Sequence, residues 1–236
     1  RTKDIPPTAE ELILLRSYPL YIFSSFSDVY KVVLEMPTVM WQLFLVYLFQ
    51  WYAMMCYWQN NSKSIALSVW NVTPKDVMGY EKAVEWNGLI GAFGFIVTFS
   101  IAFYLAKLAK KHGAKMIHFA CLLFGAISFL WFPTIQNQYV FFAVIIGYGI
   151  AWASMMGIPY LMVVAVIPKE RYGVYMGIIN MMIVIPMIIQ NLSFGYILKN
   201  FLDNDPRQAI SFAGVLLMLA AICTLLIKIK NTKVSE

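Results

Sequence analysis

Eight side chains that could bind a polar ligand lie inside long apolar runs of this 236-residue sequence. Three of them are aromatic residues in the run 139–167, and three are amides in the next run, 172–198. An earlier run contains a neighbouring amide and indole. The eight residues are Gln50, Trp51, Tyr148, Trp152, Tyr160, Asn180, Gln190 and Asn191. An apolar environment penalises an amide that has no partner, so these positions are candidates for a binding site.

Aromatic rings and amides together suit the recognition of a sugar. A flat ring covers the apolar face of a pyranose, and amides bind its hydroxyl groups. At helical spacing, Tyr148, Trp152 and Tyr160 lie near one face of their run, which we expect to bind a ligand. Two alternatives stay open: these three rings face lipid or the protein core, and Gln50 and Trp51 belong to an aromatic packing surface.

Two groups of small residues are predicted to pack helices closely, since small side chains let helix backbones approach each other in lipid. In the run of residues 139–167 they are Gly149, Ala153 and Gly157. In the run of residues 86–108 they are Asn87, Gly91, Gly94 and Thr98.

The elements that position these residues must be membrane-spanning helices. Hydrophobic residues make up 61% of the chain and charged residues 13%, whereas soluble domains average about 25% charged. A bilayer core of about 30 Å needs about 20 helical residues, and six runs are long enough. The sequence predicts an all-α membrane protein with spans at about 37–59, 86–108, 116–132, 139–167, 174–198 and 209–227.

The polar segments set the expected orientation. Lys and Arg are concentrated in alternate segments, which by the positive-inside rule places both chain ends in the cytoplasm. We expect a cytoplasmic linker over 1–36, with an interfacial helix opened by the capping pair Thr8 and Glu11. We also expect an outer polar loop over 60–85 and a cytoplasmic tail over 229–236.

Several functional classes have little support in the sequence. Cys56, Cys121 and Cys223 lie in apolar runs at unrelated spacings, so we interpret them as small hydrophobic residues and expect no metal. We expect His112 and His118 to be interfacial.

The net charge of +6 is not gathered into a basic stretch with aromatics, so nucleic acid is not an expected partner. No Asp, Glu, Lys or Arg lies in the middle of a span, which argues against an intramembrane hydrolase, and we expect no enzyme.

Two motifs carry a resemblance to a known family. The basic turn LAKLAKKHGAK at 105–115 and the stretch RYGVYMGIIN at 171–180 resemble the carboxy-terminal half of a major facilitator superfamily transporter. The segments GIPY at 157–160 and GVYMGIIN at 173–180 are similar to those of the sucrose and maltose proton symporters, relatives of the glycoside–pentoside–hexuronide cation symporters. The chain departs from that pattern in two places: the turn lacks an acidic residue, and Met187 stands where the family often has Gln.

The resemblance implies a fold, an activity and partners. Each half of such a transporter is a 3+3 inverted repeat, and transport is cation-coupled sugar symport by alternating access. The coupling proton or sodium would bind in an amino-terminal half, because the spans here have no central charge. Since the chain starts without Met, we expect it to be part of a longer polypeptide. The expected partners are a sugar, the amino-terminal half and the lipid of a plasma membrane or bacterial inner membrane. The alternatives are an exporter of drugs or amphiphiles and a six-span protein that transports nothing.

Overall fold

The computed structural model describes residues 33–168 and 171–228. Most of the predicted linker, including Thr8 and Glu11, and the predicted tail over 229–236 lie outside the described residues. The chain divides into two compact units, 1–36 and 37–236, and the spanning helices found in the described residues all belong to the second unit. Every regular element of the described ranges is a helix, as the composition predicts.

Six helices in the described part of the chain are long and apolar enough to cross a membrane. They are α3 (Thr38–Ile65), α4 (Val77–His112), α5 (Ala114–Trp131), α6 (Phe141–Val164), α7 (Tyr172–Phe201) and α8 (Pro206–Leu225). Short 3₁₀ turns at Phe132–Thr134 and Gln138–Val140 flank the connection from α5 to α6. The predicted all-α fold with six spanning helices is confirmed.

The predicted polar loop over 60–85 is wrong. Helix α3 continues into a π-helical turn at Ala66–Trp70, and α4 begins at Val77, where the Asp76 carboxylate accepts a hydrogen bond from the Gly79 amide. Hydropathy detects only the part of a helix inside the bilayer, whereas backbone hydrogen bonding continues into water. At 1.5 Å per residue, the 36 residues of α4 reach about 54 Å, well beyond a bilayer core of about 30 Å.

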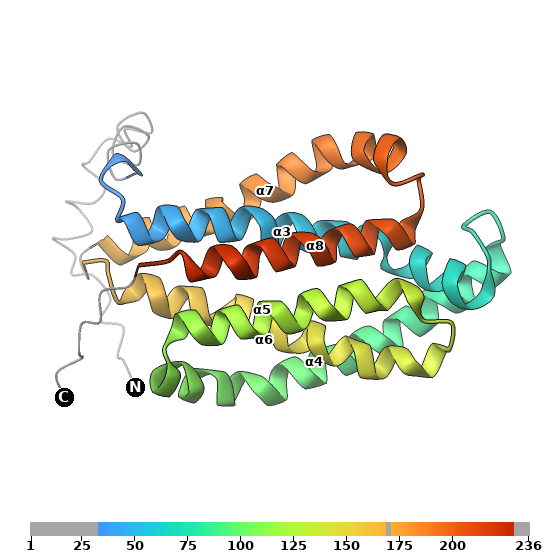
Figure 1. Cartoon of the computed structure of the whole chain (residues 1–236), viewed down its shortest axis with the longest axis horizontal. Helices are drawn as coiled ribbons and strands as arrows, with labels where there is room; N and C mark the ends of the chain where they lie inside the picture. The colour runs from blue at the N-terminus through green and yellow to red at the C-terminus, as the bar shows by residue number, and fades with distance from the viewer. Residues whose placement is uncertain (1–32, 169–170, 229–236) are drawn as a thin grey trace, which may run out of the picture. The chain divides into compact units, whose positions relative to one another are not determined.

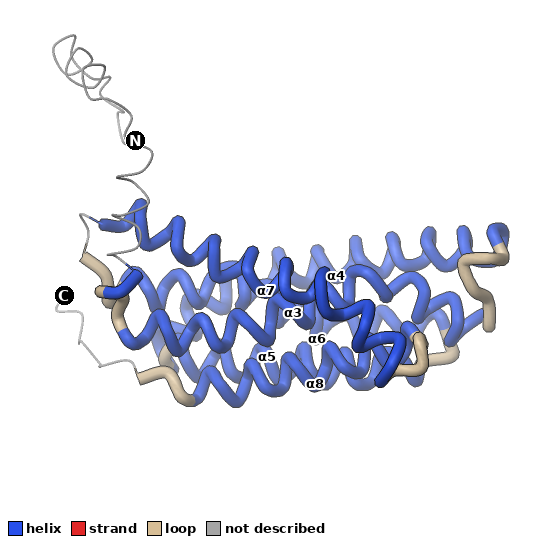
Figure 2. The backbone as a smooth tube through the Cα atoms, turned by 90° about the horizontal axis from the view of Figure 1, so that it is seen from above, coloured by secondary structure: helices blue, strands red, loops and turns tan. Residues whose placement is uncertain are grey.

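The helices alternate in direction, so α3 begins and α8 ends at the same end of the bundle (Figure 1). Helix α8 packs between α3 and α5, α6 packs between α5 and α4, and α7 packs on α3. Figure 2 shows the same bundle turned by 90°. The first three helices and the last three make equivalent contacts if α3, α4 and α5 correspond to α6, α7 and α8. The α3–α8 contact then corresponds to α6–α5, and the α3–α7 contact corresponds to α6–α4. This is the contact pattern of the predicted 3+3 inverted repeat.

Small residues bring α4 and α6 together at one crossing. A Cβ atom added to Gly149 would lie 2.8 Å from the Gly94 carbonyl oxygen and 2.9 Å from the Val97 Cβ atom. The Thr98 hydroxyl, in turn, donates to the Gly149 carbonyl at 3.1 Å. The predicted packing is confirmed at these positions but not at Gly91 or Gly157, where an added Cβ atom would meet nothing within 4 Å.

The expected interfacial position of His118 stays a prediction, but its side chain is not exposed: it is fully buried between α5 and α6. Its Nδ1 atom lies 2.7 Å from the Ser154 hydroxyl, which is also fully buried. The helix that carries His118 begins only four residues earlier, at Ala114, and α6 covers the imidazole there. His112, the last residue of α4, is exposed.

Candidate binding site

Helices α3 and α6 bring four aromatic side chains into one cluster, made of Trp51, Trp58, Tyr148 and Trp152 and called here the aromatic cluster. Trp152 is its centre. The ring of Trp152 stacks on that of Tyr148, with centroids 6.1 Å apart and planes 10° apart. It also meets the rings of Trp51 and Trp58 edge-on, with centroids at 5.8 Å and 5.5 Å. Three of the predicted residues are therefore neighbours, although they come from helices about 100 positions apart in the sequence.

The aromatic cluster has a buried base and a partly open rim. Trp51 and Tyr148 are buried, Trp152 is half-buried, and Trp58 is 36% exposed. Behind Tyr148, the ring of Tyr57 lies at a centroid distance of 5.1 Å. A base fixed by ring-to-ring contacts would hold Trp152 and Trp58 in place while leaving part of their surface free for a ligand.

The buried face of α3 beside this cluster carries polar atoms that no described residue hydrogen-bonds. They are the Tyr47 hydroxyl, both amide atoms of Gln50 and the Trp51 indole nitrogen. Leaving a buried donor or acceptor unsatisfied costs about 1–3 kcal/mol, so structures usually provide it with a partner. Gln50 and Trp51 thus combine the predicted residue types with free hydrogen-bonding capacity.

A second polar group joins α3 to α7 and is called here the amide cluster: Gln59, Gln190 and Asn191. The Gln190 amide nitrogen donates to the Gln59 side-chain oxygen at 2.9 Å. The Gln59 amide nitrogen donates to the Asn191 side-chain oxygen at 3.0 Å. Gln190 is fully buried and its side-chain oxygen has no partner among the described residues, whereas Asn191 is exposed. Sequence reasoning missed Gln59 because it stands at the predicted end of its span.

The structure does not bring Tyr160 or Asn180 into either cluster. Tyr160 is half-buried on α6, eight residues after Trp152, which is about 12 Å along a helix. Asn180 is exposed on α7, ten residues before Gln190, or about 15 Å. A role for either residue stays a prediction.

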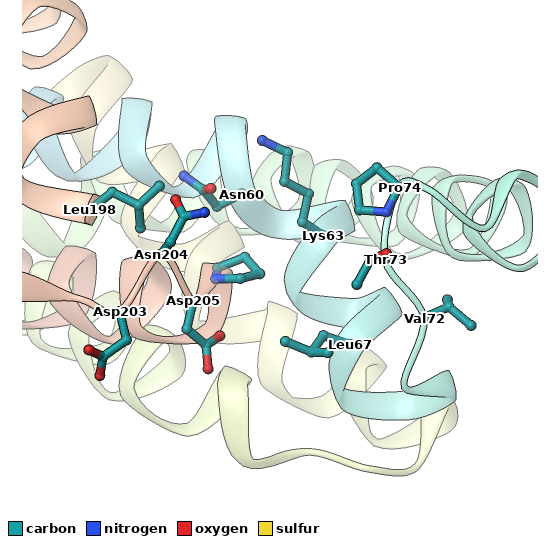
Figure 3. A pocket seen from close by; sticks show the side chains of 11 residues that line it. Asn60, Lys63, Leu67, Val72, Thr73, Pro74, Leu198, Asp203, Asn204 and Asp205 are labelled. Atoms are coloured by element: carbon teal, nitrogen blue, oxygen red, sulfur yellow. The ribbon is translucent and has the colours of Figure 1, made fainter. Parts of the chain in front are cut away.

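A separate pocket of about 480 Å³ lies where α3, α7 and α8 reach the far end of the bundle. Figure 3 shows Asn60 and Lys63 of α3 on one side and the loop residues Asp203 and Asp205 on the other. Asp205 is held by Arg207, with a 2.7 Å contact between the guanidinium and the carboxylate. None of the eight predicted residues lines this pocket, and the described residues contain no group of His, Cys, Asp or Glu able to hold a metal ion.

A comparison with protein families decides the class of this protein. The family model described as Major Facilitator Superfamily matches residues 2–191. The chain belongs to the major facilitator superfamily. It is therefore an integral, multi-pass membrane protein from a superfamily of transporters. Searches of curated proteins and of solved structures found no match.

Two helices of this major facilitator chain have faces that the other described helices leave uncovered. In the most apolar 18-residue stretch of α4 only 17% of residues are buried, and in that of α7 only 28%, against 44–56% for the other four spans. Exposed large apolar residues on these two helices include Phe95, Phe99, Phe103, Ile188 and Leu192. These faces are available to lipid or to another part of a transporter.

Proposed function

We propose that the chain is the carboxy-terminal half of a cation-coupled sugar symporter that works by alternating access. The observation that carries this proposal is the position of Trp152. Its ring is flanked by three other aromatic rings, yet it stays half-buried. One of those rings belongs to Trp51, whose indole nitrogen has no partner among the described residues, and Gln50, one position earlier on α3, has an unpaired amide. A half-exposed indole surface next to unpaired amide and N–H groups matches the apolar face and hydroxyl edge of a pyranose.

The two clusters would have different tasks in that function. The aromatic cluster would support the apolar face of the sugar ring, while Gln50 and the amide cluster would bind hydroxyl groups. Gln190 suits this task because its nitrogen is held by Gln59 while its oxygen has no partner among the described residues. A hydroxyl donated to that oxygen would satisfy a buried acceptor that is otherwise unpaired.

Coupling and gating would require the amino-terminal half. The central turns of the six spans carry no Asp, Glu, Lys or Arg, and a coupling ion at membrane depth needs such a group or a set of oxygen ligands. The uncovered faces of α4 and α7 would then contact the other half, with the sugar bound between the halves near the middle of the bilayer.

The proposal is tested by transport into liposomes containing the full-length protein. Labelled maltose, sucrose and a pentoside are offered under an imposed proton or sodium gradient, and a cationic dye is offered in parallel. Saturable, gradient-driven uptake of a sugar supports the proposal, whereas movement of the dye without any sugar would establish an exporter of amphiphiles instead. The 236-residue chain alone is the control and should insert without transporting, because its sugar site lacks the second half.

A further inference from the structure

A basic pocket of about 720 Å³ lies at the end of the bundle where α3 begins, remote from both clusters. Three chain segments line it: the turn from α4 to α5, the end of α6 and the end of α8. Its charged or titratable lining residues are His112, Lys115 and Lys228, and no lining residue is acidic. Lys110 and Lys111 come directly before His112 at the end of α4.

Two hydrogen bonds hold the side chain of Lys115, the least exposed of these cations. The Lys115 ammonium donates to the carbonyl oxygens of Leu225 and Ile227, each at 3.0 Å. These bonds hold the charge at the end of α8 and leave capacity for a third hydrogen bond. No carboxylate of the described residues forms an ion pair with Lys115 or Lys228, so both positive charges remain available to an anion.

The rest of the basic pocket is apolar and reaches the surface. Met116, Leu161 and Leu226 are exposed, and Met162 is buried beneath them. Apolar side chains at the end of a spanning helix lie at the depth where lipid acyl chains meet their head groups. A soluble anion would contact only the cationic side chains, whereas a phospholipid would contact both the cationic side chains and these apolar residues.

We propose that the basic pocket binds one anionic phospholipid of the inner leaflet, with its phosphate on Lys115 and Lys228 and an acyl chain over Leu161 and Leu226. The charge pattern of the chain predicts that this end of the bundle faces the cytoplasm. Basic pockets between spanning helices on that side suit anionic head groups. This site is independent of the sugar site and of its substrate.

The test is native mass spectrometry of the full chain in mild detergent, with equal amounts of phosphatidylglycerol and phosphatidylcholine of matched acyl chains. Wild-type protein should retain phosphatidylglycerol in excess. Lys228→Gln should lower the phosphatidylglycerol to phosphatidylcholine ratio by about fivefold, since each lysine near a membrane surface contributes about that factor. Lys75→Gln, an exposed lysine in the loop at the opposite end of the bundle, removes the same charge and should leave the ratio unchanged.

Further arms separate lipid binding from structural effects and from a soluble anion. Lys115→Arg keeps the charge and should keep the preference, while Lys115→Gln should lose it. Melting temperatures measured with phosphatidylglycerol, phosphatidylcholine or inorganic phosphate should rise most with phosphatidylglycerol. Equal retention of the two lipids, an equal loss in Lys75→Gln, or full stabilisation by inorganic phosphate would each overturn the proposal.

Discussion

The amide of Gln190 on α7 donates a 2.9 Å hydrogen bond to the side-chain oxygen of Gln59 on α3. Helix α7 buries only 28% of its most apolar stretch, and this bond is one of the polar links that join it to α3. The Tyr52 and Ser193 hydroxyls, 2.8 Å apart, provide another link between the same two helices. Gln59 and Gln190, which belong to the proposed sugar site, therefore also help to hold α7 against α3.

Replacing Gln190 with Ala should loosen α7. The variant loses the bond to Gln59, and we expect the free energy of unfolding in detergent to fall by about 1 kcal/mol. The control is Asn200→Ala on the same helix, an exposed amide that donates to the Tyr196 carbonyl of its own helix. Asn200→Ala should change that free energy by less than about 0.5 kcal/mol. Equal losses would mean that the Gln59–Gln190 bond contributes nothing specific.

Trp152→Ala in the full-length transporter should weaken sugar binding. Loss of a stacked ring costs about 1–3 kcal/mol, which corresponds to a roughly 5- to 150-fold rise in Kd measured by calorimetry. Trp131→Ala is the matched control, because Trp131 is 51% exposed and lies at the end of α5. Similar effects of both substitutions on Kd would indicate general damage to the fold and count against the aromatic cluster as the sugar site.

Gly149→Ala should disturb the contact between α4 and α6. The new methyl group would lie 2.8 Å from the Gly94 carbonyl oxygen, so the helices would have to separate or the protein would lose stability. We expect the free energy of unfolding to fall by roughly 1–3 kcal/mol. Gly157→Ala on the same helix meets nothing within 4 Å and should be neutral or slightly stabilising. Thermal unfolding of both variants in one detergent gives the comparison, and a stable Gly149→Ala protein would contradict it.

Ser154→Ala should destabilise the protein by leaving the buried imidazole of His118 without its partner. A buried polar group that loses its only hydrogen bond costs about 1–3 kcal/mol. The other ring nitrogen of His118 already lacks a partner among the described residues, so no alternative bond is at hand. Ser100→Ala is the control, because that exposed hydroxyl bonds only the Ile96 carbonyl of its own helix. Denaturant unfolding should show a clear loss for the first variant alone.

The start of α8 should weaken in acid. Burial raises the pKa of Asp205, but hydrogen bonds from Arg207 lower it by more, so the pKa lies below its ordinary value of 3.8. The ionised carboxylate therefore stabilises the fold fully above pH 3.8 and loses that effect as the pH falls through the lowered pKa. Asp205→Ala should cost about 1 kcal/mol at neutral pH through loss of the helix cap, and this difference should shrink in acid. Unfolding measured at pH 7 and near pH 3 tests both statements.

Much of the fold could be predicted because hydropathy and helix length are local properties. The six spans follow from apolar runs long enough to cross a bilayer, and the packing of α4 on α6 follows from small residues at helical spacing. Loop lengths could not be read in the same way, since α3 continues through polar residues to Ile65 and a π-helical turn extends it to Trp70.

The candidate site was predictable only residue by residue. The spacing of Tyr148 and Trp152 places both on one face of α6, but nothing in the sequence indicates that Trp51 lies against that face. Asn180 and Gln190 have the same polar character within one apolar run, yet one is exposed and the other buried, because only the second faces α3. His118 shows the same limit, since its hydrogen-bond partner, Ser154, belongs to another helix.

The packing of α3 along α8 has a consequence for how the protein is made. These are the first and last of the spanning helices in the described residues, and each is a principal neighbour of the other. During synthesis α3 enters the membrane before the other five helices of the described bundle, and the face of α3 that packs on α8 has no native partner until α8 arrives. The bundle therefore closes only after α8 has left the ribosome, and a chain truncated before α8 would leave one face of α3 open to lipid or to insertion chaperones.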